Sequence, residues 1–311
     1  MKIKTKKTYY ERRTQNVQKI EKAILLLELR IKDCIIDFGN CSDESGKQKI
    51  ESEIELYTNL LSGAVIIWCE SLIKALFYEH GAFEEEQINE LLSKDKSLEQ
   101  KWALALTCAF FKAFSGQAYN PTSPITNKSM VLNLGSIAQC EKDKFTILYD
   151  LIETRLVPAI KIRNKIQHGD WVFAFNEAKF EKVSGLRNLT QKPIFDRKST
   201  PKIQQENMLT LRLKRNQFRV IYGLTKDLAV FKRYGQFRGD NSSTPFQHNF
   251  AKRYNQILSN QGLIDTSSFE KYRNDLVLSK QRGKKWKRKN KNIFIKIKNW
   301  ITDIFKRIVK I

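Results

Sequence analysis

The stretch from residue 49 to residue 80, KIESEIELYTNLLSGAVIIWCESLIKALFYEH, decides the fold class of this chain. Its apolar side chains recur three and four positions apart, the spacing that places them on one face of an α-helix. That face consists of Ile54, Tyr57, Leu61, Val65, Trp68, Leu72 and Leu76. Gly81 ends the pattern, because glycine favours helix termination. The stretch therefore predicts one long helix with a buried stripe.

The same spacing recurs along most of the chain. Only 13 Gly and 6 Pro interrupt its 311 residues, and few segments alternate with period two, so we predict an all-α bundle. Further helices are predicted over residues 9–38, 84–114 with a break near Lys94–Ser97, 142–168 with Pro158 as a kink or junction, 206–234, 246–258 and 267–280. Between them, residues 115–140 are expected to form a long connection, and residues 170–205 a loop or a short hairpin.

Composition narrows the class of protein. Hydrophobic residues make up 41% of the chain, enough for a real core. The five cysteines include no C-x-x-C pair, and with only three histidines we expect no metal site, cofactor or disulfide framework. The first apolar run, residues 23–27, is closed by Glu28, so we expect no signal peptide. The apolar stretches are shorter than a membrane span, so we expect a cytoplasmic protein.

The positive charge lies mainly at the two ends. The formal net charge is +23, of which residues 1–19 carry +6 and residues 282–311 carry +11. We therefore divide the chain into a basic N-terminal arm (1–19), a helical bundle (20–260, with its core at 20–175) and a basic C-terminal extension (261–311). Such arms bind nucleic acid or an anionic membrane surface, and charge alone does not choose between the two.

The run RNKIQHGDW, residues 163–171, brings together the side chains that carry chemistry. Asn164 and His168 are four positions apart and share a helix face, and the long stem of Arg163 can reach round to the same phosphate. The helix C-terminus favours a protonated His168. A guanidinium beside a protonated imidazole suits RNA cleavage by attack of the ribose 2′-OH on phosphorus, without a metal ion. An Arg and a His at a helix end also suit the helix dipole without any function.

The chain resembles the HEPN family, small α-helical domains of prokaryotes and higher eukaryotes that include many ribonucleases. Arg163, Asn164 and His168 match the family motif of an Arg, a polar residue and a His at the end of a bundle helix, followed here by Gly169. The stretch 68–76, WCESLIKAL, resembles an early HEPN helix from which one acid projects into the site, and this points to Glu70. A lone Glu on a helix can equally be a solvated residue. The resemblance covers about residues 15–175.

The resemblance implies a metal-independent endoribonuclease that acts in prokaryotic antiviral defence, as a toxin or abortive-infection effector. Arg163 would hold the scissile phosphate, His168 would move protons, Asn164 would fix the geometry and Glu70 would orient Arg163. It further implies a homodimer with one composite site, and a neutralising or regulatory protein partner. The alternative is a catalytically silent HEPN module that binds RNA, a nucleotide or a partner protein.

The basic C-terminal extension offers a surface for RNA. Capture of RNA is expected at Lys165 and in the cationic run, at Lys284, Lys285, Lys287, Arg288 and Lys289. Residues 292–311 predict an amphipathic helix with a wide apolar stripe around Trp300. This helix suits contact with an anionic membrane at its inner face, or packing on the body or a partner subunit. Residues 293–297 also alternate as a short strand would.

Overall fold

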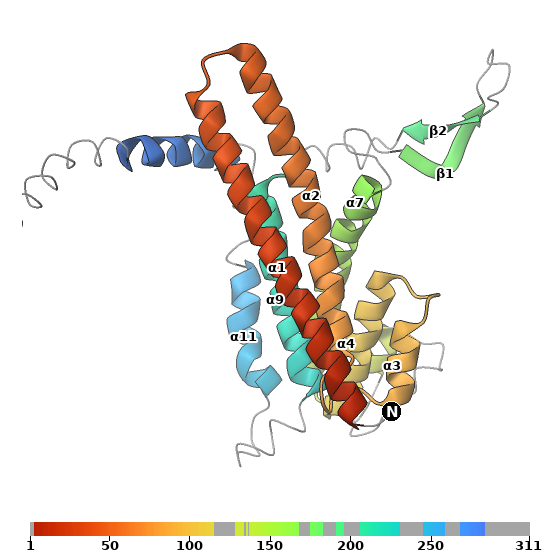
Figure 1. Ribbon diagram of the computed structural model, residues 1–311. Coiled ribbons are helices and arrows are strands. Elements are labelled where there is room, and N and C mark those ends of the chain that lie inside the picture. The colour runs from red at the N-terminus through yellow and green to blue at the C-terminus, as the bar shows by residue number, and fades with distance from the viewer. Residues whose placement is uncertain are drawn as a thin grey trace, which may run out of the picture. The chain divides into compact units, whose positions relative to one another are not determined.

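The computed structural model describes residues 3–114, 128–133, 135, 137–167, 175–182, 191–195, 206–230, 245–258 and 268–283. The prediction of an all-α fold is confirmed, and helices make up nearly all of these residues (Figure 1). The elements are α1 (Ile3–Asn40), α2 (Glu44–Leu76), α3 (Glu85–Leu92), α4 (Leu98–Phe114), α5 (Lys128–Leu132), α6 (Gln139–Leu151), the π-helical turn η1 (Ile152–Leu156), α7 (Val157–Gln167), β1 (Phe175–Lys182), β2 (Gln191–Phe195), α9 (Met208–Ala229) and α11 (Pro245–Leu258). A further helix covers residues 268–283.

One predicted helix boundary is confirmed and another is displaced. The expected break inside residues 84–114 separates α3 from α4, where Ser97 and Gln100 form reciprocal backbone contacts, Ser97 N to Gln100 Oε1 at 2.8 Å and Gln100 N to Ser97 Oγ at 3.4 Å. This reciprocal contact satisfies backbone N–H groups that the first turn of a helix leaves without partners. Helix α2 spans Glu44–Leu76 and not residues 49–80, so it ends before Gly81, which has a φ of 75° and turns the chain a few residues later as only glycine does readily.

Two further elements differ from the expectation. Helix α1 begins at Ile3, so residues 3–19, set apart by charge as an arm, form its first turns, and Val17 there is buried. Helix α5 lies within the expected connection 115–140, with Val131 buried. Of the two alternatives for residues 170–205, a loop or a short hairpin, the structure has the hairpin pairing, in which β1 and β2 are antiparallel with a register shift between Asn176 and Phe180. The C-terminal segment 292–311 lies outside the described residues.

The chain forms two compact units, one from residues 1–28 and 58–263 and the other from residues 29–57 and 264–311. These boundaries differ from the division suggested by charge, because α1 and α2 each contribute to both units. In the second unit Arg273 donates to both carboxylate oxygens of Glu51, at 2.9 and 2.7 Å, and its guanidinium lies 4.7 Å from the Phe38 ring centroid. This bidentate, ring-stacked Arg ties the helix 268–283 to α1 and α2.

The first unit holds the large aromatic core. Its fully buried side chains include Trp68, Trp102, Phe77, Phe83, Phe110, Phe145, Phe218 and Phe246. Helix α9 packs through this core against α4, and α11 packs on α9 (Figure 1). The start of α9 is fixed by Asn207, whose side chain accepts from the backbone N–H groups of Leu209 and Thr210. The unit therefore offers rigid helical supports for the residues singled out in the sequence.

Candidate functional site

Helix α7 carries the Arg of the predicted motif. Pro158 stands at its first turn, where a missing N–H is tolerated, and the π-helical turn η1 directly precedes it. Arg163 follows one and a half turns later, and only 14% of its side chain is exposed. A guanidinium that is buried to this extent needs a carboxylate or polar partners nearby.

That partner comes from α2, which lies beside α7 in the first unit (Figure 1). Nη2 of Arg163 is 3.7 Å from Oε2 of Glu70, whose side chain is 30% exposed. The other carboxylate oxygen of Glu70 accepts from Lys74, one turn further along α2. The expected contact of Glu70 with Arg163 is therefore present, and Glu70 is not simply a solvated carboxylate.

Cys69, which precedes Glu70 in the chain, is a core residue. Burial, together with the nearby charge of Glu70, raises the pKa of Cys69 far above its ordinary value, so this thiol stays protonated. Burial also raises the pKa of Cys108, to about 12. Both are therefore inert core residues. Cys140, by contrast, is exposed.

The other predicted site residues divide into two groups. Asn164 follows Arg163 on α7 and is exposed, and Lys165 is half-buried. His168 lies outside the described residues, as do the expected RNA-binding residues Lys284, Lys285, Lys287, Arg288 and Lys289. The structure thus brings together Glu70 and Arg163, and Asn164 and Lys165 directly follow Arg163 in the chain.

The guanidinium of Arg163 is the group of this pair that can bind a phosphate. A guanidinium presents five N–H donors in a planar fork, which suits a carboxylate on one side and a phosphate oxygen on another. A carboxylate that fixes the guanidinium reduces the rotamer entropy lost when an anion binds. The restrained guanidinium of Arg163 therefore suits stabilisation of negative charge on phosphoryl oxygens.

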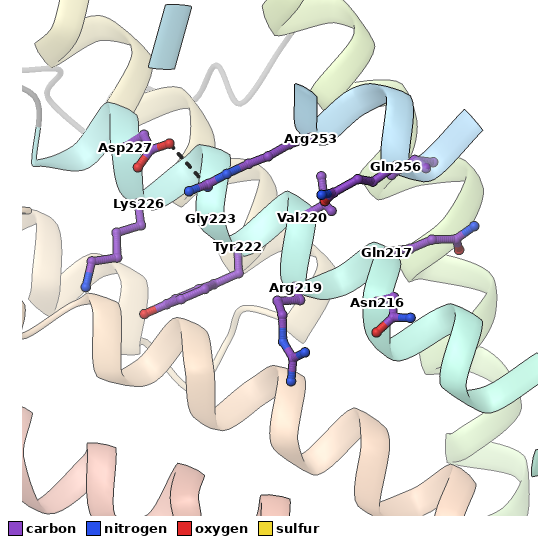
Figure 2. Close-up of a pocket in the computed structure, with 11 residues that line it drawn as sticks. Asn216, Gln217, Arg219, Val220, Tyr222, Gly223, Lys226, Asp227, Arg253 and Gln256 are labelled. Carbon is purple, nitrogen blue, oxygen red and sulfur yellow. Dashed lines mark ion pairs between the residues drawn. The ribbon is translucent and has the colours of Figure 1, made fainter. Parts of the chain in front are cut away.

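A second polar site, which the sequence did not reveal, lies along α9 and α11. It is a cavity of about 620 Å³ lined by Asn216, Gln217, Arg219, Val220, Tyr222, Gly223, Lys226, Asp227, Arg253, Gln256 and Ile257. We call it the α9–α11 groove. Figure 2 shows Arg253 reaching from α11 across Gly223 to Asp227, while Arg219, Tyr222 and Lys226 leave α9 on the side away from α11. The only signal in the sequence was the number of cations on α9.

Burial changes the protonation equilibria in the α9–α11 groove. It raises the pKa of Tyr222 to about 12, and it raises the pKa of Asp227 despite the opposing effects of Arg253, Asn249 and Lys226. Burial lowers the pKa of Lys226, but Tyr222 and Glu79 outweigh this, and the net shift is upward. Nζ of Lys226 lies 3.0 Å from Oε2 of Glu79. At neutral pH the groove therefore holds a charged Lys226 beside an uncharged Tyr222.

Within the described ranges, no three His, Cys, Asp or Glu side chains are grouped so that they could hold a metal ion. Helix α2 is long and apolar enough to cross a bilayer, but 56% of its most apolar window is buried inside the fold. This degree of burial is compatible with a soluble protein, in which α2 is a core helix.

Comparison of the chain with protein-family models, with curated proteins and with solved structures finds no match.

Proposed function

We propose that this protein is a metal-independent endoribonuclease of HEPN type. The observation that carries the proposal is the contact between Arg163 and Glu70, because it holds a guanidinium at the end of α7 beside the position of the motif His in the chain. The proposed reaction is the one that the resemblance to the HEPN family implies, and this reaction requires no cofactor.

In this reaction the ribose 2′-oxygen attacks phosphorus and the bond from phosphorus to the 5′-oxygen breaks. The proton of the 2′-OH is taken up by a base, and the leaving 5′-oxygen receives a proton. Arg163 neutralises the charge that develops on the phosphoryl oxygens, and His168 moves protons. Asn164 fixes their geometry, and Glu70 acts as a positioning residue for Arg163. The products are a 2′,3′-cyclic phosphate and a 5′-hydroxyl.

The experiment is RNA cleavage by the purified full chain in EDTA, with the product ends identified. We expect wild-type protein to cut RNA but not DNA of the same sequence, and Arg163→Ala and His168→Ala each to lower the rate at least about 100-fold. Lys161→Ala, an exposed cation on the same helix, and His80→Ala, an exposed histidine, are matched controls that keep activity. Cleavage that survives both site changes would refute the assignment. Tight RNA binding without cleavage would instead support the silent HEPN module.

We further propose that two copies form one composite site and that the protein acts in the cytoplasm in antiviral defence. A composite site predicts that Arg163→Ala protein, mixed with wild type, lowers the activity per wild-type subunit. A neutralising protein partner, and contact of residues 292–311 with an anionic membrane, belong to the same proposal.

A further inference from the structure

We infer that the α9–α11 groove is a binding site for a small phosphate monoester, separate from the proposed catalytic site. The inference rests on the lining side chains, their charges and the space between them, and it is independent of the ribonuclease proposal. The cavity of about 620 Å³ falls in the size range of small-molecule sites.

Charge defines the class of ligand. Arg219, Lys226 and Arg253 line the groove, against one carboxylate, Asp227. Glu79 neutralises Lys226, so the guanidiniums of Arg253 and Arg219 are the lining groups that can turn to an anion, and a phosphate monoester carries close to two negative charges near neutral pH. Neutral lining amides from Asn216, Gln217 and Gln256 add hydrogen-bonding groups for the organic part of such a molecule.

Arg253 is positioned by its surroundings before any ligand arrives. Its Nη1 lies 3.2 Å from Oδ2 of Asp227, and the same carboxylate oxygen accepts from Nδ2 of Asn249 at 3.1 Å. A Cβ at Gly223 would collide with the guanidinium, so the absence of a side chain there creates the seat in which Arg253 lies (Figure 2). A guanidinium held on one edge by a carboxylate can offer its other edge to a phosphate.

The opposite side of the groove supplies an exchangeable cation. Arg219 is 55% exposed, and its Nη2 is 3.6 Å from Oε1 of Glu21, a pair that contributes little in water. Its guanidinium also lies 5.6 Å from the ring of Trp68. Arg219 can therefore turn to a phosphate at small loss, whereas Lys226 stays with the buried carboxylate of Glu79.

The test is calorimetric titration of the full chain with 5′-AMP, adenosine, the dinucleotide ApA and inorganic phosphate at low salt. We expect 5′-AMP to bind, inorganic phosphate to compete with it, and adenosine and ApA to bind at least about tenfold more weakly, because each lacks the dianion. Undetectable binding of 5′-AMP, or equal binding of adenosine, would overturn the inference. Equal binding of ApA would also overturn it, because the site would then recognise the RNA diester.

Variants locate the binding in the groove. Arg253→Gln and Arg219→Gln should each weaken 5′-AMP binding about tenfold. Lys252→Gln removes the same charge from the neighbouring, exposed position of α11 and should leave the affinity within about twofold. Should Arg253→Gln fail to fold, Gly223→Ala displaces the guanidinium while favouring the helix, and it should weaken binding to the same extent. Unchanged affinity in the folded variants would place the ligand elsewhere and refute the site.

Discussion

Nη2 of Arg163 lies 3.7 Å from Oε2 of Glu70, although 93 positions separate the two residues in the chain. The same carboxylate also accepts from Lys74. Glu70 therefore links a cation of its own helix to the Arg of α7, and this contact suits the positioning role that we propose for it.

A positioning role for Glu70 makes its effect depend on Arg163. We expect Glu70→Gln to lower RNA cleavage about tenfold, because a neutral amide holds the guanidinium less well. In the Arg163→Ala background the same change should lower the rate no further, since the residue that it positions is gone. Lys74→Gln is the matched control and should leave the rate nearly unchanged. Additive losses in the double variant would show that Glu70 acts independently of Arg163.

The cationic run should govern the salt dependence of RNA binding. Replacing Lys284, Lys285, Lys287, Arg288 and Lys289 with Gln should reduce the slope of log affinity against log salt by about 3.5, because each phosphate contact contributes about 0.7 on single strands. A control with the same loss of charge replaces five exposed lysines, Lys22, Lys49, Lys161, Lys252 and Lys271. Equal slopes for both variants would show that the run has no specific part in RNA capture. Co-sedimentation of the same two five-residue variants with anionic and with neutral vesicles tests contact with a membrane.

Two adjacent leucines on α2 test the packing of the first unit. Leu61 is fully buried, whereas 44% of Leu60 is exposed. We expect Leu61→Ala to lower the free energy of unfolding by about 2–5 kcal/mol and Leu60→Ala by less than about 1 kcal/mol. Denaturant unfolding followed by circular dichroism measures both. Similar losses for the two variants would mean that α2 presents a different face to the core.

Alkaline pH should weaken the fold through Tyr222. Burial raises its pKa from 10.0 to about 12 in the folded chain, so the unfolded chain loses this proton first. The stability that Tyr222 contributes is fully present below pH 10 and is lost as pH rises through 12, a change of about 3 kcal/mol. Tyr222→Phe should flatten this part of the stability profile, measured by urea unfolding at several pH values. Tyr9→Phe removes a half-exposed hydroxyl and should leave the profile as in wild type.

The long helices could be predicted because their apolar spacing extends over many turns. The break between α3 and α4 was also predictable, since Lys94–Ser97 interrupts the pattern with polar residues. Helix α5 was not, because five residues are too few to show a period. The start of α1 was missed because its charge suggested a separate arm, whereas those cations lie on a helix that also buries Val17.

Part of the candidate site was also accessible to sequence reasoning. The resemblance placed Glu70 with Arg163, and the structure has this contact. The α9–α11 groove was not predictable, because it depends on pairs such as Lys226 with Glu79 and on Arg253 crossing Gly223. Spacing within one helix shows which residues share a face, but it does not show which acid from another helix lies opposite.

The π-helical turn η1 sets the angular phase between α6 and α7. A π turn holds one residue more than an α turn, so every later side chain is rotated by about 100° from where a continuous helix would carry it. That rotation brings Arg163 round to the side where Glu70 stands. Removing a single residue from this turn would rotate the Arg163 guanidinium toward a different neighbour, although Arg163 and Glu70 would both still be present.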